Sequence, residues 1–182
     1  MKTSSSLISK RFALASFALA AGALLLVWIN FAQTVPAKPK TAAEGGLKKI
    51  HRLGLGPGEP LLESVRNFIR DHNIKDGAVL TGIGSLSECR LHWPKEPVYP
   101  PENVFQTFKG SLEIASLQGI IADGEPHLHL ILAEKGDVRA IGGHLEDGSK
   151  VLYLAELTIA EFDGTPMTRR PNQHNVRMLQ VK

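Results

Sequence analysis

Apolar and polar residues alternate along most of the chain after residue 47, which is the pattern of half-buried β-strands. One segment differs, because Leu61, Leu62, Val65, Phe68 and Ile69 recur at helical spacing with charged residues between them. The pattern therefore predicts an α+β fold, a mostly antiparallel β-sheet with one principal α-helix packed on it. The expected strands span residues 48–55, 78–80, 86–93, 105–108, 112–121, 127–132, 138–145 and 151–162, the last being the final strand.

Glycine and proline mark where these elements begin and end. Glu59-Pro60 opens the helix, because an acid and a proline are both tolerated in the first turn, and the helix ends near His72-Asn73. The run 82–85 (Gly-Ile-Gly-Ser) predicts a bulge or a close backbone approach, because no helix follows it as a dinucleotide site requires. The prolines of residues 94–101 predict an extended loop outside the central ladder.

The N-terminal segment has the pattern of an export leader. Lys2, Lys10 and Arg11 precede an uncharged apolar run over residues 12–32. This run is long enough to span a bilayer, so residues 1–32 are interpreted as either a cleaved signal peptide or a membrane anchor. The positive-inside rule then predicts a periplasmic or other extracytoplasmic location, with the membrane contacted only through this segment. Residues 33–47 are interpreted as a flexible linker, and residues 48–182 as the folded domain.

The net charge of +3 is unevenly distributed. Residues 1–50 hold seven basic residues and one acidic residue, whereas residues 51–182 hold fourteen basic and seventeen acidic residues, a net charge of −3. A mildly acidic domain is a poor ligand for nucleic acid, whose non-specific binding depends on neutralising phosphates. We therefore expect no nucleic-acid partner. The single cysteine, Cys89, excludes an intramolecular disulfide and is expected to be a small buried residue.

Three histidines carry the most specific chemistry of the sequence. His127 and His129 alternate with leucines, so both are expected on one face of a strand, and His144 lies on the next strand. A turn of residues 135 and 136 pairs Glu134 with Asp137 and places His127 directly opposite His144, with His129 diagonal to it. An odd loop or a bulge at 142–143 would instead turn His144 to the other face.

Neutral imidazole suits Zn²⁺, and three protein ligands leave a fourth position open. His127, His129 and His144 are therefore the candidate metal ligands, with zinc as the candidate ion. Glu125 and Glu156 are candidates for a nearby base, because they are acids near the expected hairpin or on the neighbouring strand. The remaining histidines at positions 51, 92 and 174 are expected at the surface, and His72 is a favourable cation at the helix end.

Four segments together resemble the plants-and-prokaryotes-conserved (PPC) domain family. They are residues 58–64 (Gly-Glu-Pro-Leu-Leu-Glu-Ser), 77–86 (Gly-Ala-Val-Leu-Thr-Gly-Ile-Gly-Ser-Leu), 123–129 (Asp-Gly-Glu-Pro-His-Leu-His) and 142–145 (Gly-Gly-His-Leu). The resemblance covers residues 48–182 and implies a mostly antiparallel sheet, a homotrimer and, in prokaryotic members, a histidine cluster associated with metal. Plant members carry AT-hooks that bind DNA. This chain has no Arg-Gly-Arg-Pro hook, and Arg169-Arg170-Pro171 stands at the wrong end.

Three hypotheses about function follow from these patterns. The first is an exported zinc-binding homotrimer, with or without metal-assisted catalysis at the three histidines. The second is a ligand-binding or scaffolding trimer, with a small molecule as its ligand and histidines that are structural. The third is the DNA association of the plant family members, which the charge of the domain and the export leader both disfavour.

Overall fold

The computed structural model describes residues 43–134 and 139–182, and residues 41–182 form one compact unit. The expected leader and the turn at residues 135–138 lie outside the described residues. Within the described part, no helix is long and apolar enough to span a membrane. Among the described residues the order of elements is one strand, one helix and then seven strands.

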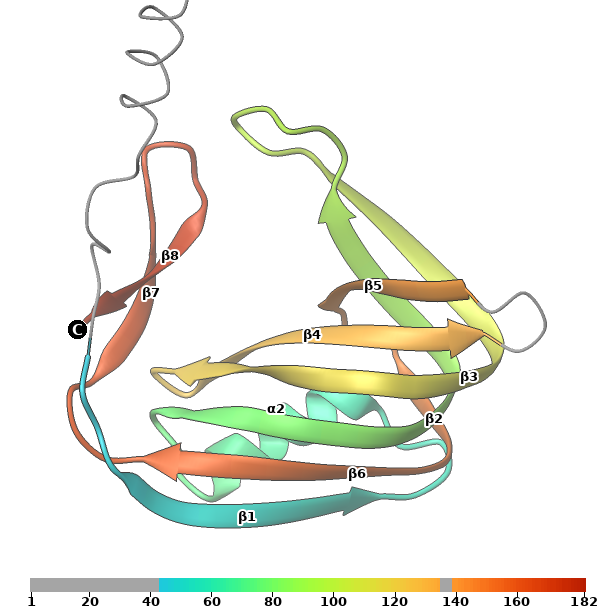
Figure 1. The fold of residues 1–182 in the computed structure, drawn as a ribbon, viewed down its shortest axis with the longest axis horizontal. Coiled ribbons are helices and arrows are strands. Elements are labelled where there is room, and N and C mark those ends of the chain that lie inside the picture. Colours follow the sequence, from blue (N-terminus) through green and yellow to red (C-terminus); the bar gives the residue numbers. More distant parts are fainter. Residues whose placement is uncertain (1–42, 135–138) are drawn as a thin grey trace, which may run out of the picture. The chain divides into compact units, whose positions relative to one another are not determined.

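Six antiparallel strands form the main sheet in the order β1-β6-β2-β3-β4-β5 (Figure 1). Strand β2 also pairs with β5 through Leu91 and His92, so the C-terminal end of β2 contacts both β3 and β5. The α+β class predicted from the sequence is confirmed. The bounds are β1 Leu47–Leu55, β2 Gly77–Pro94, β3 Asn103–Ala122, β4 Glu125–Glu134, β5 Arg139–Leu145 and β6 Lys150–Phe162.

Strands β2 and β3 are longer than the sequence pattern indicated. Each merges two expected strands, because bulges interrupt the alternation without breaking the ladder. The bulges in β2 lie around residues 79–88 and include the expected irregularity at Gly84. Gly84 has a φ of +138°, and a Cβ there would lie 2.2 Å from the carbonyl oxygen of Leu154. Only glycine fits this position, where β2 and β6 approach closely.

Helix α2, Leu61–Asp71, covers one face of the sheet (Figure 1). Pro60 precedes it in an extended conformation, and Asn73, at a φ of +50°, follows its end. Its apolar residues at positions 61, 62, 65 and 69 are buried against strand residues such as Leu128, Leu130 and Ile159. This face therefore holds the hydrophobic core, which provides most of the folding free energy through apolar burial.

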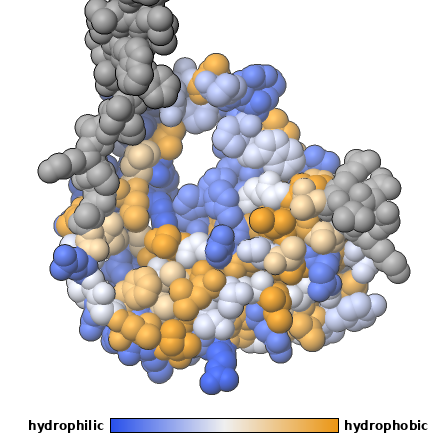
Figure 2. Space-filling model, viewed as in Figure 1, coloured by the Kyte–Doolittle hydropathy of each residue, from blue (hydrophilic) through white to orange (hydrophobic). Residues whose placement is uncertain are grey.

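The opposite face of the sheet carries several exposed apolar side chains. Ile50, Leu80, Ile83, Ile120 and Ile131 are all more than two-fifths exposed. Figure 2 views this face and shows apolar residues gathered over the lower strands and near β4 and β5. A sheet face of this composition resembles an interaction surface more than a solvated one.

Two C-terminal strands were not expected from the sequence. β7, Met167–Pro171, and β8, Arg177–Val181, form a separate antiparallel hairpin, so the strand ending at Phe162 is not the last. Each strand is only five residues long, and the arginines at 169, 170 and 177 leave too few positions to show the alternation that identifies a strand. Hydrogen bonds attach the hairpin to the domain: Asp76 Oδ1 accepts from the Met167 amide at 2.9 Å, and Arg169 donates to the Ile120 and Glu125 carbonyls at 3.2 Å each.

Candidate metal site

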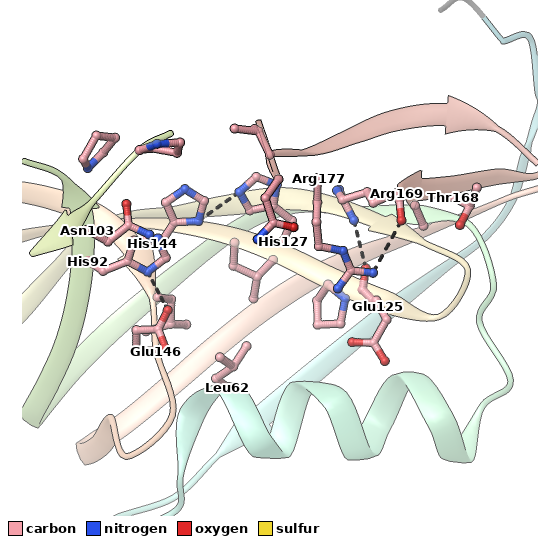
Figure 3. Close-up of a pocket in the computed structure, with 18 of the residues that line it drawn as sticks. Leu62, His92, Asn103, Glu125, His127, His144, Glu146, Thr168, Arg169 and Arg177 are labelled. Atoms are coloured by element: carbon pink, nitrogen blue, oxygen red, sulfur yellow. Dashed lines mark hydrogen bonds and ion pairs between the residues drawn. The ribbon is translucent and has the colours of Figure 1, made fainter. Parts of the chain in front are cut away.

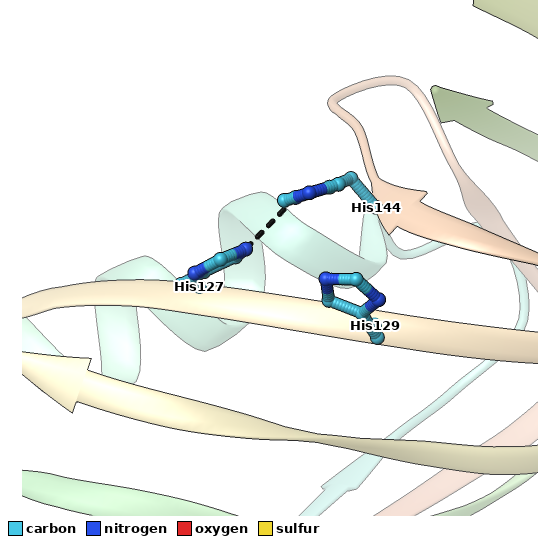
Figure 4. Close-up of side chains that lie close together, drawn as sticks. All are labelled: His127, His129 and His144. Carbon is cyan, nitrogen blue, oxygen red and sulfur yellow. Dashed lines mark hydrogen bonds between the residues drawn. The ribbon is translucent and has the colours of Figure 1, made fainter. Parts of the chain in front are cut away.

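The alternation of β4 separates its chemistry from its packing. Leu128, Leu130 and Leu132 are buried in the core, whereas His127 and His129 lie on the opposite face. His144 of β5 projects to this same face, so the three histidines meet as the sequence predicted (Figure 4).

The predicted register was wrong by two residues. The final pair of the β4–β5 ladder is Glu134 with Arg139, and His144 therefore stands opposite His129 rather than His127. Because side chains alternate with a period of two, a shift of two residues leaves every side chain on its original face. His127 is therefore the diagonal neighbour of His144, and the three side chains still converge on one face.

The three imidazoles are close enough to share one ion. Each offers a ring nitrogen, and these atoms all lie within 4.8 Å of one another. His127 Nε2 and His144 Nδ1 are 3.0 Å apart and form a hydrogen bond, with their rings stacked at a centroid distance of 4.5 Å. The rings of His129 and His144 are 4.2 Å apart. His144 is thus the central member of the cluster.

Both half-buried members of the cluster favour the neutral form. Burial lowers the pKa of His127, and the Arg169 guanidinium and neighbouring imidazoles lower it further. Burial, followed by the imidazoles of His129, His92 and His127, lowers the pKa of His144 to about 4. A neutral imidazole keeps a lone pair available, so these two side chains are ready to ligate a cation at neutral pH.

A fourth histidine adjoins the cluster and was not predicted. His92 of β2 pairs with His144 across the β2–β5 ladder, and their rings stack at 4.2 Å with an interplanar angle of 7°. The His92 Nδ1 atom lies 2.6 Å from Glu146 Oε1. A Cβ at Gly143 would lie 2.7 Å from the His92 carbonyl oxygen, so glycine lets β5 approach β2 here. His92 is therefore a half-buried part of the site rather than a free surface residue.

His127 and His144 of the cluster, together with His92, line a cavity of about 810 Å³ (Figure 3). Its lining includes His92, His127 and His144, the loop after β2, and residues of the β7–β8 hairpin. The tip of that hairpin meets the loop after β2, where the rings of His174 and Tyr99 are 4.7 Å apart. Figure 2 shows the hollow between the β7–β8 hairpin and the loop after β2.

The two candidate bases have different positions. Glu125 lines the cavity, but Glu156 does not, because it lies on β6, three strands from β4, where it pairs with Gly54 and Ile83. Glu146 is the acid that contacts the histidines directly, through His92, which stacks on His144. The sequence pattern thus placed Glu125 near the histidines, whereas the position of Glu146 depends on the β2–β5 pairing.

Other single residues were partly misjudged. His51 was expected at the surface, but it is only 8% exposed, lies 3.1 Å from the Glu161 carboxylate, and makes a T-shaped ring contact with Phe68. Cys89 is buried as expected, and burial raises the pKa of its thiol to about 11. A thiol that stays protonated is neither a nucleophile nor a metal ligand at neutral pH.

Together, the sheet topology and the cluster define an α+β domain with a three-histidine site on its open face. Comparison with known proteins then gives the family, because the Plants and Prokaryotes Conserved (PCC) domain matches residues 42–163. The chain belongs to this family, whose domain is also abbreviated PPC. The resemblance seen in the sequence is confirmed.

Among curated proteins, the chain is similar to the Bifunctional protein GlmU of two Synechococcus strains. One is 29% identical over 137 residues and the other 30% identical over 142 residues, covering 75% and 74% of this chain. The chain spans only about a fifth of the length of these relatives, 20% and 22%.

Solved structures share the fold. A plant- and prokaryote-conserved (PPC) protein from Pyrococcus horikoshii is 26% identical, with a TM-score of 0.66, and the match covers 78% of this chain and 98% of that protein. A metal-containing protein from Archaeoglobus fulgidus is 23% identical, with a TM-score of 0.67, and the match covers 78% of this chain and 99% of that protein.

Proposed function

We propose that this chain is a metal-binding protein whose site consists of His127, His129 and His144, with zinc as the ion. The observation that carries the proposal is the convergence of three ring nitrogens within 4.8 Å on one sheet face. The metal-containing protein from Archaeoglobus fulgidus has the same fold, which supports the same kind of site here.

The geometry suits a tetrahedral ion. Two ligands placed about 2.0–2.1 Å from zinc at a tetrahedral angle lie about 3.3 Å apart. The 3.0 Å between His127 Nε2 and His144 Nδ1 is close to this value, so small ring rotations suffice for those two ligands. Three protein ligands leave one open position, where bound zinc supplies a Lewis acid. Metal analysis of the purified full-length chain tests the proposal, with about one zinc ion per chain expected.

The metal site should resist mild acid. Protons compete with metal for imidazole, and the lowered pKa values of His127 and His144 move that competition to lower pH. We expect His127 and His144 to continue to bind zinc below pH 6.5. Their contribution to zinc affinity should fall as the pH approaches about 4, the pKa of His144. Competition titrations with a zinc indicator at a series of pH values measure this. A steep loss of affinity that is complete above pH 6.5 would contradict the account.

We further propose that the protein assembles as a homotrimer and is exported through residues 1–32. The trimer follows from the family resemblance, and the exposed apolar face of the sheet supports assembly of this kind. Light scattering of a fragment that starts at residue 43 should give three times the protomer mass. A monodisperse monomer at micromolar concentration would exclude the trimer.

The second candidate function is a ligand-binding trimer without metal. The hydrogen bond between His127 and His144 favours it, because two histidines can satisfy each other without an ion. The cavity beside them would then hold a small molecule directly. DNA binding remains disfavoured, since residues 51–182 carry a net charge of −3.

A further inference from the structure

Two arginines of the C-terminal hairpin line the cavity beside the histidines. Arg169 of β7 and Arg177 of β8 lie on the side of the cavity nearest His127 and Glu125 (Figure 3). Both lie beyond residue 163, where the family match ends. Arg169 is half-buried and donates to the Ile120 and Glu125 carbonyls, and Arg177 donates to the Arg169 carbonyl at 3.5 Å.

These two cations lack a carboxylate partner within residues 43–134 and 139–182. Nearby acids are paired elsewhere: Asp123 with Lys182 at 2.7 Å, and Glu146 with His92 at 2.6 Å. Glu96 and Glu125 also line the cavity, but neither forms an ion pair with an arginine of the described part of the chain.

The two guanidinium groups repel each other, with Arg169 half-buried and Arg177 exposed to solvent. Burial lowers the pKa of Arg169, and the charge of Arg177 lowers it further. A guanidinium carries five N–H donors, so donation to carbonyls leaves several donors unused on each side chain. Arginine forks match the oxygen atoms of carboxylate and phosphate groups, and such charge-assisted bonds are about twice as strong as neutral ones.

We propose that the cavity binds a small ligand through a carboxylate or phosphate group held by Arg169 and Arg177. This inference rests on the proposed function, because two of the three proposed metal ligands, His127 and His144, line the same cavity. The hairpin would thus determine the ligand class, and the histidines would hold the ion beside it. The cavity volume of about 810 Å³ accommodates a metabolite-sized molecule.

The test is calorimetric titration of the zinc-loaded full-length chain with inorganic phosphate and, separately, with acetate. Arg177→Gln should weaken binding of the preferred anion by about tenfold or more, the loss typical of one charge-assisted hydrogen bond. Arg170→Gln is the matched control, because Arg170 is exposed on the same hairpin and does not line the cavity. We expect it to change the affinity by less than about twofold. Tighter binding of phosphate than of acetate assigns the ligand to phosphate esters, and the reverse assigns it to carboxylates.

Zinc content, measured on the same samples, separates this inference from the metal site. Full zinc loading with no binding of either anion, or with equal affinities in wild type and Arg177→Gln, overturns the anion site and leaves the metal site standing. Absence of zinc, with anion binding that Arg177→Gln still weakens, supports the anion site and overturns the proposed function.

Discussion

His144→Ala is expected to lower zinc affinity by more than about 100-fold, since loss even of a group that only orients a metal ligand costs about 10–100-fold. His144 is the central ligand: its Nδ1 lies 3.0 Å from His127 Nε2, and it stands opposite His129 across the ladder. Metal content after dialysis against a weak chelator measures the loss. His129→Ala should remove most of the metal by the same reasoning.

His174→Ala is the matched control for the loss of one imidazole. His174 contacts Tyr99 at the hairpin tip and does not belong to the cluster, so full metal content is expected. Circular dichroism should show that His129→Ala remains folded, because the leucines of β4 pack on the other face. Unchanged zinc in His144→Ala would contradict the three-histidine site.

Leu130→Ala should lower the stability of the fold and leave metal binding unchanged. Leu130 of β4 is fully buried in the hydrophobic core, with 0% of its surface exposed. Truncating a buried leucine to alanine costs about 2–5 kcal/mol through lost transfer free energy and the residual cavity. Chemical denaturation in the presence of EDTA measures the free energy of unfolding without a contribution from metal.

Leu47→Ala is the control for this substitution, because Leu47 at the start of β1 is 61% exposed. Its effect should stay within about 0.5 kcal/mol. Folded Leu130→Ala should still bind zinc in the wild-type ratio. If Leu130→Ala lowered the free energy of unfolding by less than about 1 kcal/mol, this would contradict the placement of Leu130 in the hydrophobic core.

The fold was largely predictable because its signals are local. Alternation identified the strands, and helical spacing at residues 61–69 identified helix α2. The bulges of β2 and β3 were less predictable, since they interrupt alternation within continuous strands. The β7–β8 hairpin was missed because three arginines in short strands obscure any buried face.

The candidate site was predictable in its members and less so in its register. His127 and His129 are two residues apart on a strand, so they must lie on one face of the sheet. The register prediction was wrong by two residues, and a shift of two residues leaves His144 on that same face. The role of His92 could not be derived in this way. Its contact with His144 depends on pairing of β2 with β5 between residues more than fifty positions apart in the chain, for which no local pattern exists.

X-ray absorption at the zinc edge tests the central claim most directly. The zinc-loaded full-length chain should show three imidazole nitrogens at about 2.0–2.1 Å and one further light ligand, and His144→Ala should lose this spectrum. A wild-type spectrum without imidazole scattering, or with sulfur at about 2.3 Å, would show that zinc binds elsewhere and would contradict a site at His127, His129 and His144.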